Sequence, residues 1–399
     1  MNNKTKSTIF WLGMAFFFLP GLVHAYLLMP FPGSQDLEAI KLCYYLEKII
    51  LPLRILGAVL IAVYFIKYPK GVTTKSKVVK IAVMVIGLVS FYFTDYEYKA
   101  ATMFKEPGTI KFANAIHSKV PESYLIIGVV NNGVAKAYPV IYLGYHHKVQ
   151  DSVGALPVLV TYCTMCRTGR VFSPIINGKK QVFRLVGARH YNAVIEDEDT
   201  KTWWYQATGE AAVGPMRGSS FKEIPYEQST LAAWLNKHPG SLILQPDNGF
   251  RADYADLKNY DRVQAVDKDS TLVNKNSLVR KSWVLGVVIN KQPKAYNWRK
   301  LQRLRVLNDS IGNIPLMLAI EKDSLTFHAW KRSIDGKVLN FKIAPDGQLT
   351  DNETASVWNG DGTCISGTLK GTQLIKQQAY QEYRHSWLHF HPGTLLWNE

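Results

Sequence analysis

Disulfide-forming cysteines and nucleic-acid-binding patterns are both scarce in this sequence. Four cysteines in 399 residues are too few for a fold that depends on disulfide bonds. Lysine and arginine outnumber aspartate and glutamate by 47 to 31, which gives a formal net charge of +16. No known DNA- or RNA-binding motif accompanies this charge, and the lysines are not interleaved with aromatic side chains on one helix. These absences exclude a disulfide scaffold, and we expect no nucleic acid among the partners.

Long apolar runs are confined to the N-terminal quarter of the chain. They cover residues 9–28, 49–66 and 78–93. A bilayer core about 30 Å thick is crossed by roughly 20 apolar residues in a helix. We therefore predict a membrane anchor with three transmembrane helices in residues 1–97, which makes the lipid bilayer one partner of the chain.

Basic residues cluster in the loop between the second and third runs. The loop and its edges carry five lysines, namely Lys67, Lys70, Lys75, Lys77 and Lys80. Basic loops stay in the cytoplasm, so the three helices should cross in–out, out–in and in–out. Everything after Thr94 would then lie outside the cytoplasm. The tripeptide at 23–25 resembles a signal-peptidase site, but cleavage there would not change the side of the C-terminal region.

The rest of the sequence contains an internal repeat. The tripeptide GVV at 128–130 recurs at 286–288, and INGKKQVFRL at 176–185 recurs as IDGKVLNFKI at 334–343. Hairpin dipeptides such as Asn-Gly, flanked by β-branched and apolar residues, are typical of β-strands. We predict an α+β, β-rich fold in which the transmembrane helices are followed by two tandem, pseudo-symmetric extracytoplasmic domains, at 98–250 and 251–399.

Residues that recur in both copies are expected to serve the fold. Asp151 recurs as Asp309 in the same short motif, DSVG and DSIG. An aspartate in this setting often accepts a hydrogen bond from the backbone two residues further on. We therefore expect a turn role for Asp151.

Two cysteines at C-x-x-C spacing occur in the first copy alone. Cys163 and Cys166 match Glu321 and Ser324 of the second copy. Three more polar residues of the first copy, His146, His147 and Glu210, match Leu304, Arg305 and Thr363. We therefore expect one working site, in the first domain, and a degenerate second copy without the C-x-x-C.

Metal binding is one interpretation of this pattern. Cys163, Cys166 and His146 would form a set of soft ligands suited to copper or zinc. His147, His190 and Arg167 would support these ligands from around the site.

Thiol redox chemistry is a second interpretation, with Cys163, Cys166 and Glu210 as catalytic residues. C-x-x-C is the usual spacing for thiol–disulfide exchange. The residues after Cys166 predict a turn into a strand rather than the helix found in thioredoxin-like sites, although Arg167 could favour a thiolate. This interpretation would make the chain an enzyme.

A structural disulfide is the main alternative to both. The chain would then be a non-catalytic binding or structural module in which the C-x-x-C is a staple. Its second copy would present a surface to a periplasmic protein partner. The loop-entropy model gives such a small ring about 2 kcal/mol of stabilisation.

The chain resembles a known family in two stretches of the first copy. These are AYPVIYLGYHHKVQDSVGALPVLVTYCTMCRTGRVF at 137–172 and WYQATGEAAVGPMRG at 204–218. They resemble the uncharacterised bacterial family named domain of unknown function 3179, in which His146 takes the place of the family histidine. His147 stands where the family more often has glutamate. The resemblance implies a fold and a site position but no reaction, and with the lysine pattern it implies a three-pass protein of the bacterial inner (cytoplasmic) membrane.

Overall fold

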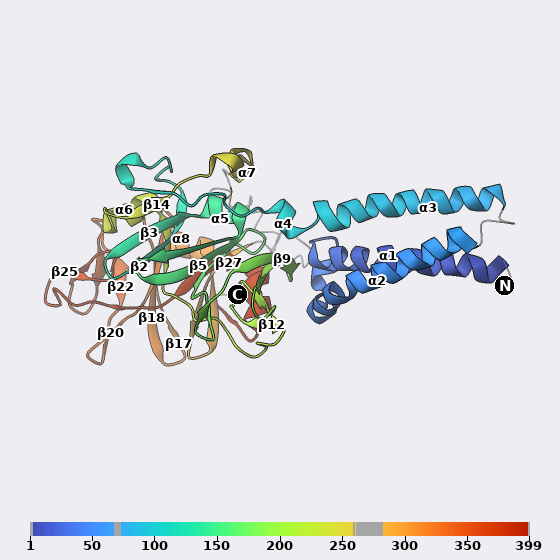
Figure 1. The fold of residues 1–399 in the computed structure, drawn as a ribbon. Helices are drawn as coiled ribbons and strands as arrows, with labels where there is room; N and C mark the ends of the chain where they lie inside the picture. Colours follow the sequence, from blue (N-terminus) through green and yellow to red (C-terminus); the bar gives the residue numbers. More distant parts are fainter. Residues whose placement is uncertain (1–2, 68–72, 258–259, 261–281, 398–399) are drawn as a thin grey trace. The chain divides into compact units, whose positions relative to one another are not determined.

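The computed structural model describes residues 3–67, 73–257, 260 and 282–397. These residues form two compact units. Unit 1 comprises residues 1–105 and 181–220, and unit 2 comprises residues 106–180 and 221–399. Both units are drawn in Figure 1. The sequence-derived boundaries at 97/98 and 250/251 stay predictions, as does the pseudo-symmetry of two complete domains.

Unit 1 contains three long apolar helices. Its helical elements are α1 (Asn3–Leu28), η1 (Ser34–Asp36), α2 (Ile40–Lys67), α3 (Thr74–Tyr92), η2 (Phe93–Glu97) and α4 (Ala100–Met103). The segments Ser7–Leu28, Ile40–Lys67 and Thr74–Glu97 are long and apolar enough to cross a membrane. The prediction of three such helices is confirmed, with the second beginning nine residues earlier than its apolar run. Of the five clustered lysines, Lys70 lies outside the described residues.

A partly buried ion pair explains how the second apolar run tolerates an arginine. The two terminal nitrogens of Arg54 bond the two carboxylate oxygens of Asp95, at 2.7 and 2.5 Å. The Nε of Arg54 also donates to the carbonyl oxygen of Phe17 at 3.3 Å. A paired and hydrogen-bonded charge costs far less to bury than an isolated one. The pair therefore connects α2, the end of the third helical segment and α1.

A small antiparallel sheet completes unit 1. Its strand order is β12-β11-β10-β9, with bounds β9 (Phe183–Arg189), β10 (Asn192–Asp197), β11 (Trp203–Tyr205) and β12 (Ala211–Val213). Leu28 and Tyr44 from the helices pack with Trp203 of the sheet in one apolar cluster. Arg189 is fully buried and donates to the carbonyl oxygens of Leu27, Ser34 and Leu37. The sheet is thus fastened to the ends of the apolar helices.

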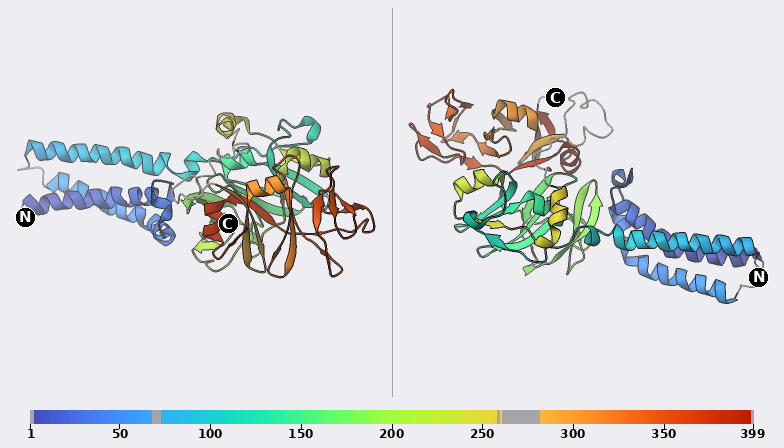
Figure 2. Two further views of the ribbon diagram at one scale, coloured as in Figure 1. Left: turned by 180° about the vertical axis from the view of Figure 1, so that it is seen from behind. Right: turned by 90° about the horizontal axis from the view of Figure 1, so that it is seen from above.

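Unit 2 is β-rich and consists of two halves, residues 106–180 with 221–260 and residues 282–397. The first half contains β1 (Phe112–Ala113), η3 (Ala115–His117), β2 (Leu125–Asn131), β3 (Val134–Pro139), α5 (Val140–His146), β4 (Lys148–Val153), β5 (Leu156–Cys163), β6 (Thr168–Phe172), β7 (Ile175–Ile176), β8 (Lys179–Lys180), β13 (Glu227–Thr230), α6 (Leu231–Lys237), β14 (Leu242–Leu244), η4 (Asn248–Phe250) and α7 (Arg251–Asp256). The second half contains β15 (Trp283–Ile289), β16 (Gln292–Asn297), α8 (Trp298–Leu304), β17 (Val306–Ile311), β18 (Ile314–Ile320), β19 (Phe327–Lys331), β20 (Ser333–Ile334), β21 (Lys337–Val338), β22 (Phe341–Ile343), β23 (Leu349–Asp351), β24 (Val357–Trp358), β25 (Cys364–Ser366), β26 (Ile375–Lys376), β27 (Ala379–Tyr383), α9 (Arg384–Phe390) and β28 (Leu395–Trp397). The two halves lie side by side in Figure 2. The prediction of an α+β, β-rich region after the apolar helices is confirmed.

The principal sheets of the two halves have the same strand order. The first is β1-β14-β3-β2-β13 and the second is β28-β16-β15-β27, with β1 as the one additional strand. A further motif, WLxxHPG, recurs at 234–240 and 387–393. In both sheets the hairpin is antiparallel, and the strand after this motif joins it in parallel. The shared order follows the repeated sequence motifs.

A glycine under a tryptophan explains why GVV recurs. A Cβ added to Gly128 would lie 2.3 Å from the Trp234 ring, and one added to Gly286 would lie 2.2 Å from the Trp387 ring. Each tryptophan comes from the short helix that covers the sheet, α6 or α9, and each is buried. Only glycine leaves room for the ring at this distance.

The turn role expected for Asp151 is wrong. Asp151 lies within β4, and its Oδ2 accepts from Lys136 Nζ at 2.7 Å and from the Tyr138 hydroxyl at 2.8 Å. Asp309 forms the matching ion pair with Lys294 at 2.6 Å. The aspartate recurs because it joins the strand to the hairpin beside it, while Gly154 provides the turn with a φ of +55°.

Candidate thiol site

The C-x-x-C turn connects two buried strands. The run from Val158 to Cys163 is completely buried in β5, and β6 begins at Thr168. Cys163 pairs with Thr168 across the turn, and Arg167 closes it with a left-handed φ of +56°. The predicted turn into a strand is confirmed. The helix N-terminus that lowers a thiol pKa in thioredoxin-like sites is therefore not part of this turn.

The turn brings the two cysteines together. The side chains of Cys163 and Cys166 are fully buried, and both are present as thiols. The Sγ of Cys166 lies 3.7 Å from the carbonyl oxygen of Cys163. Burial raises the pKa of the Cys166 thiol well above its ordinary value, and its hydrogen bond with Cys163 adds to the rise. Both effects favour the protonated thiol near neutral pH.

The backbone of the turn is held by residues far away in the sequence. Tyr383, at the end of β27, donates its N–H to the carbonyl oxygen of Cys166 at 2.9 Å. The hydroxyl of Tyr260 donates to the carbonyl oxygen of Thr164 at 3.0 Å. The second half of unit 2 therefore contributes directly to the conformation of the C-x-x-C turn.

Arg167 is committed to aromatic and amide partners. Its guanidinium carbon lies 3.5 Å from the centroid of the Trp283 ring, and its Nε donates to Gln381 Oε1 at 2.9 Å. The side chain is completely buried. Arg167 thus anchors the turn on the second half of unit 2.

A second buried arginine near the turn is neutralised by a carboxylate. Arg170 Nη2 lies 2.5 Å from Glu382 Oε1, and the Arg170 guanidinium stacks 3.7 Å from the centre of the Tyr380 ring. Both charged side chains are buried. This pairing offsets the positive charge that would otherwise favour a thiolate.

The two histidines upstream of the turn have different environments. His146 Nε2 lies 2.6 Å from the Tyr254 hydroxyl, and its ring meets Phe250 edge to face. His147 is buried, and this burial lowers its pKa to about 4, so the ring is neutral at pH 7. Its backbone carbonyl accepts from the N–H of Tyr162, next to Cys163.

In the described ranges, no His, Asp or Glu side chain forms a compact three-ligand group with the thiols. No group of three His, Cys, Asp or Glu ligand atoms within 4.8 Å of one another includes Cys163, Cys166 or His146 there. The three-ligand set stays a prediction. The turn itself brings together the sulfur atoms of Cys163 and Cys166.

Two residues of the predicted site belong to unit 1. His190 is buried, and its Nε2 lies 3.4 Å from Glu38 Oε1. Glu210 is exposed, and its carboxylate accepts from the Thr208 hydroxyl at 3.4 Å. The thiols lie in unit 2.

Sequence reasoning missed the partners that surround the turn, including Trp283, Gln381 and Glu382. One signal could have pointed to Glu382. The WLxxHPG motifs align it with Ser229, so the two copies differ at this position by a negative charge. Gln381 aligns with Gln228 in the same way, and the Nε2 of Gln228 donates to Gln381 Oε1 at 3.1 Å. The matched strands of the two halves therefore meet beside the thiol turn.

A family model described as "Protein of unknown function (DUF3179)" matches residues 107–394. The chain belongs to this family, as the resemblance suggested. No curated protein and no solved structure matches the chain.

Proposed function

We propose that this DUF3179 protein holds a Cu(I) ion between Cys163 and Cys166, in a region that the three apolar helices anchor outside the cytoplasm. The observation that carries the proposal is the fully buried pair of neighbouring thiols in the β5–β6 turn. The lysine-rich loop between the second and third helices supports the extracytoplasmic side and the bacterial inner membrane.

The ligand set favours copper over zinc. Thiolates are soft ligands that select Cu(I), and this ion is satisfied by two of them. Zinc in proteins takes four ligands in a structural site, or three and a water in a catalytic one. Among the described residues, no His, Cys, Asp or Glu completes a three-ligand group with the two sulfurs, and this set suits Cu(I) better.

The surroundings of the turn disfavour thiol exchange. An exchanging cysteine attacks as a thiolate, whereas burial raises the pKa of Cys166. A bound Cu(I) displaces the thiol protons, so affinity should rise with pH. The buried site would hold the ion away from solvent and from competing ligands.

Copper titration of the full chain in lipid nanodiscs tests the proposal. Cu(I) is added anaerobically in the presence of a chromogenic chelator, to the wild type and to Cys163→Ser and Cys166→Ser. We expect one ion per wild-type chain and loss of that ion in both variants. Cys43→Ser and Cys364→Ser are matched controls, since both residues are also buried cysteines. Copper binding that survives in Cys163→Ser would contradict the proposal.

The non-catalytic staple is a second candidate, and the position of both buried cysteines in one tight turn favours it. A disulfide there would fix the turn that Tyr383 and Arg167 hold, and the second half would offer a surface to a periplasmic partner. The intact mass of the chain purified without reductant distinguishes the two candidates. The staple predicts loss of two hydrogens from the wild type and not from Cys166→Ser, together with no copper uptake.

A further inference from the structure

A cavity lies between the second half of unit 2 and helix α6 of the first half, apart from the thiol turn. It has a volume of about 460 Å³. Its walls include the buried Trp330 and Trp358 and the aliphatic side chains of Ile343, Leu349 and Val357. None of the residues that hold the thiol turn lines it. Small-molecule sites are typically apolar cavities of about 300–1,000 Å³ with a few placed polar groups.

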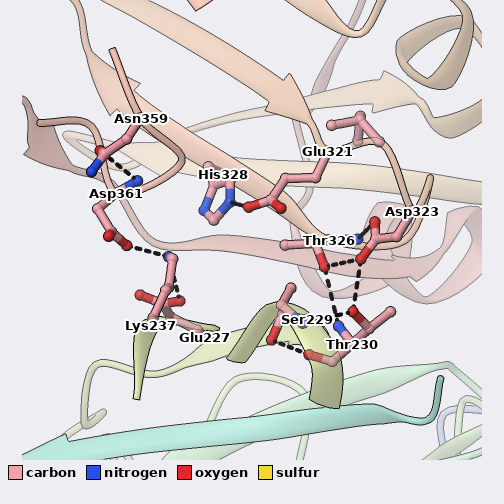
Figure 3. Close-up of polar contacts among 12 residues, drawn as sticks. Glu227, Ser229, Thr230, Lys237, Glu321, Asp323, Thr326, His328, Asn359 and Asp361 are labelled. Carbon is pink, nitrogen blue, oxygen red and sulfur yellow. Dashed lines mark hydrogen bonds and ion pairs between the residues drawn. The ribbon is translucent and has the colours of Figure 1, made fainter. Parts of the chain in front are cut away.

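Among the polar residues that line this cavity is a buried histidine oriented by a carboxylate. His328 is 4% exposed, its ring stacks on Trp330, and its Nε2 lies 2.6 Å from Glu321 Oε1. Glu321 is the hydrogen-bond partner of the ring among the residues described. A carboxylate beside Nε2 makes that nitrogen the donor in the neutral ring and leaves a lone pair on Nδ1. Figure 3 shows the second ring nitrogen turned away from Glu321.

The turn that carries Glu321 is fixed by the first half of unit 2. Asp323 Oδ2 accepts from the hydroxyls of Thr230 and Thr326, at 2.8 and 2.5 Å. Thr230 also caps the N-terminus of α6, whose residues Ala232 and Ala233 line the cavity. These contacts are drawn in Figure 3. These contacts of Asp323 fix the turn, so the carboxylate of Glu321 is held in place before any ligand binds.

A comparison with the corresponding positions of the first half explains why His328 remains available to bind a ligand. The repeat aligns Glu321 with Cys163 and His328 with Arg170. In the first half, Arg170 is neutralised by Glu382, which comes from β27 of the second half. The residue that aligns with Glu382 is Ser229, whose hydroxyl donates to the carbonyl of Thr230 at 3.1 Å. Ser229 therefore offers no carboxylate at the position that aligns with Glu382. The carboxylate of Glu227 is close enough to His328 to interact with it, but it is paired with Lys376 and Lys237.

We propose that this cavity binds a small planar aromatic molecule with a hydroxyl group, that is, a phenol. The aromatic ring would lie against the tryptophan walls, and its hydroxyl would donate to Nδ1 of His328. Two cationic side chains, Arg305 and Lys322, and two carboxylates, Glu321 and Asp323, line the cavity, so its walls carry no excess positive charge that would favour an anion. At Nδ1 of the histidine an anionic ligand is disfavoured, because the Glu321 carboxylate lies directly behind the ring. An aliphatic alcohol would lose the ring contacts with Trp330 and Trp358. This site does not depend on the proposed copper site.

Binding of 4-methylphenol to the full chain in nanodiscs tests the proposal, with toluene and benzoate as comparison ligands and empty nanodiscs as the blank. We expect one 4-methylphenol per chain. Toluene should bind about tenfold more weakly, because it lacks the hydrogen bond to the histidine, and benzoate should bind more weakly still. Equal affinities for toluene and 4-methylphenol, or no saturable binding of 4-methylphenol, would overturn the proposal.

Two variants locate the contact. His328→Phe keeps the stack on Trp330 and should reduce 4-methylphenol binding to the level of toluene. His391→Phe is the matched control, because His391 also stacks on a buried tryptophan, Trp387, but does not line the cavity. Unchanged binding in His328→Phe would contradict the proposal. If that variant does not fold, the wild-type ratio of toluene to 4-methylphenol affinity still decides the outcome.

Discussion

The guanidinium carbon of Arg167 lies 3.5 Å from the centroid of the Trp283 ring. Arg167 directly follows the second cysteine, whereas Trp283 begins the first strand of the other half of unit 2. The conformation of the C-x-x-C turn therefore depends on both halves. A first copy expressed alone would lack this contact and the hydrogen bond from Tyr383.

Arg167→Lys should destabilise unit 2. Lysine keeps the charge but loses the planar stack on Trp283 and the directed hydrogen bond to Gln381. A desolvated cation–π contact contributes about 2 kcal/mol, and a hydrogen bond about 1 kcal/mol. Thermal unfolding of the full chain should show a lower midpoint than the wild type. A midpoint equal to that of the wild type would argue against the anchoring role of Arg167.

Glu382→Gln should cost more than Arg167→Lys. The variant leaves the Arg170 charge buried without its carboxylate, a change that typically costs about 3–5 kcal/mol. Replacing both Arg170 and Glu382 with methionine removes the two charges together and should destabilise unit 2 much less. The unfolding free energies of Glu382→Gln and of the double methionine variant, measured with a chemical denaturant, give the comparison. A double variant as unstable as Glu382→Gln would show that the ion pair itself is not the cause.

Unit 2 should lose an ion-pair contribution to stability in acid. Glu227 contacts Lys376 at 2.6 Å and Lys237 at 3.1 Å. Burial raises the pKa of this carboxyl, but the two ammonium groups outweigh burial and lower it to about 2. Because the folded pKa lies below the unfolded one, the stabilisation is present above about pH 4.5 and is lost as the pH falls towards 2.

The measurement is the unfolding free energy of wild type and Glu227→Gln between pH 7 and pH 2. The difference should be on the order of 3 kcal/mol at pH 7 and should shrink to zero near pH 2. Glu122→Gln, at an exposed position, is the control and should show no such trend. A difference that stays constant with pH would contradict the assignment to Glu227.

Alanine at either GVV glycine should disrupt the core. Gly128→Ala and Gly286→Ala place a methyl group within 2.3 Å of a buried tryptophan ring, so the helix must shift. Overpacking of this kind costs about 1–3 kcal/mol. Gly240→Ala is the control, because a Cβ there meets nothing within 4 Å. Near-UV circular dichroism and thermal unfolding should separate the three variants, and equal midpoints would refute the close-contact explanation.

Local features of the fold were predictable because they leave local signals. The apolar runs predicted α1, α2 and the third helix, and the hairpin motifs predicted strands on both sides of Asn177. Recurrence showed that Asp151 serves the fold, but it could not show the reason. The partners Lys136 and Tyr138 lie across a sheet, and no spacing rule connects them to a residue in β4.

The site was predictable in its position and not in its environment. The C-x-x-C spacing correctly predicted that the two thiols lie close together, because a separation of three residues is enough to close a turn. The contacts of Arg167 with Trp283 and Gln381 come from residues more than a hundred positions away, so they depend on tertiary packing. The same holds for His146, whose ring nitrogen meets Tyr254.

X-ray absorption at the copper edge of the Cu(I)-loaded full chain tests the central claim most directly. The account predicts a first shell of two sulfur atoms and no nitrogen, and a spectrum unchanged by His146→Phe. A nitrogen ligand in the first shell that disappears in His146→Phe, or a chain that takes up no copper, would contradict it.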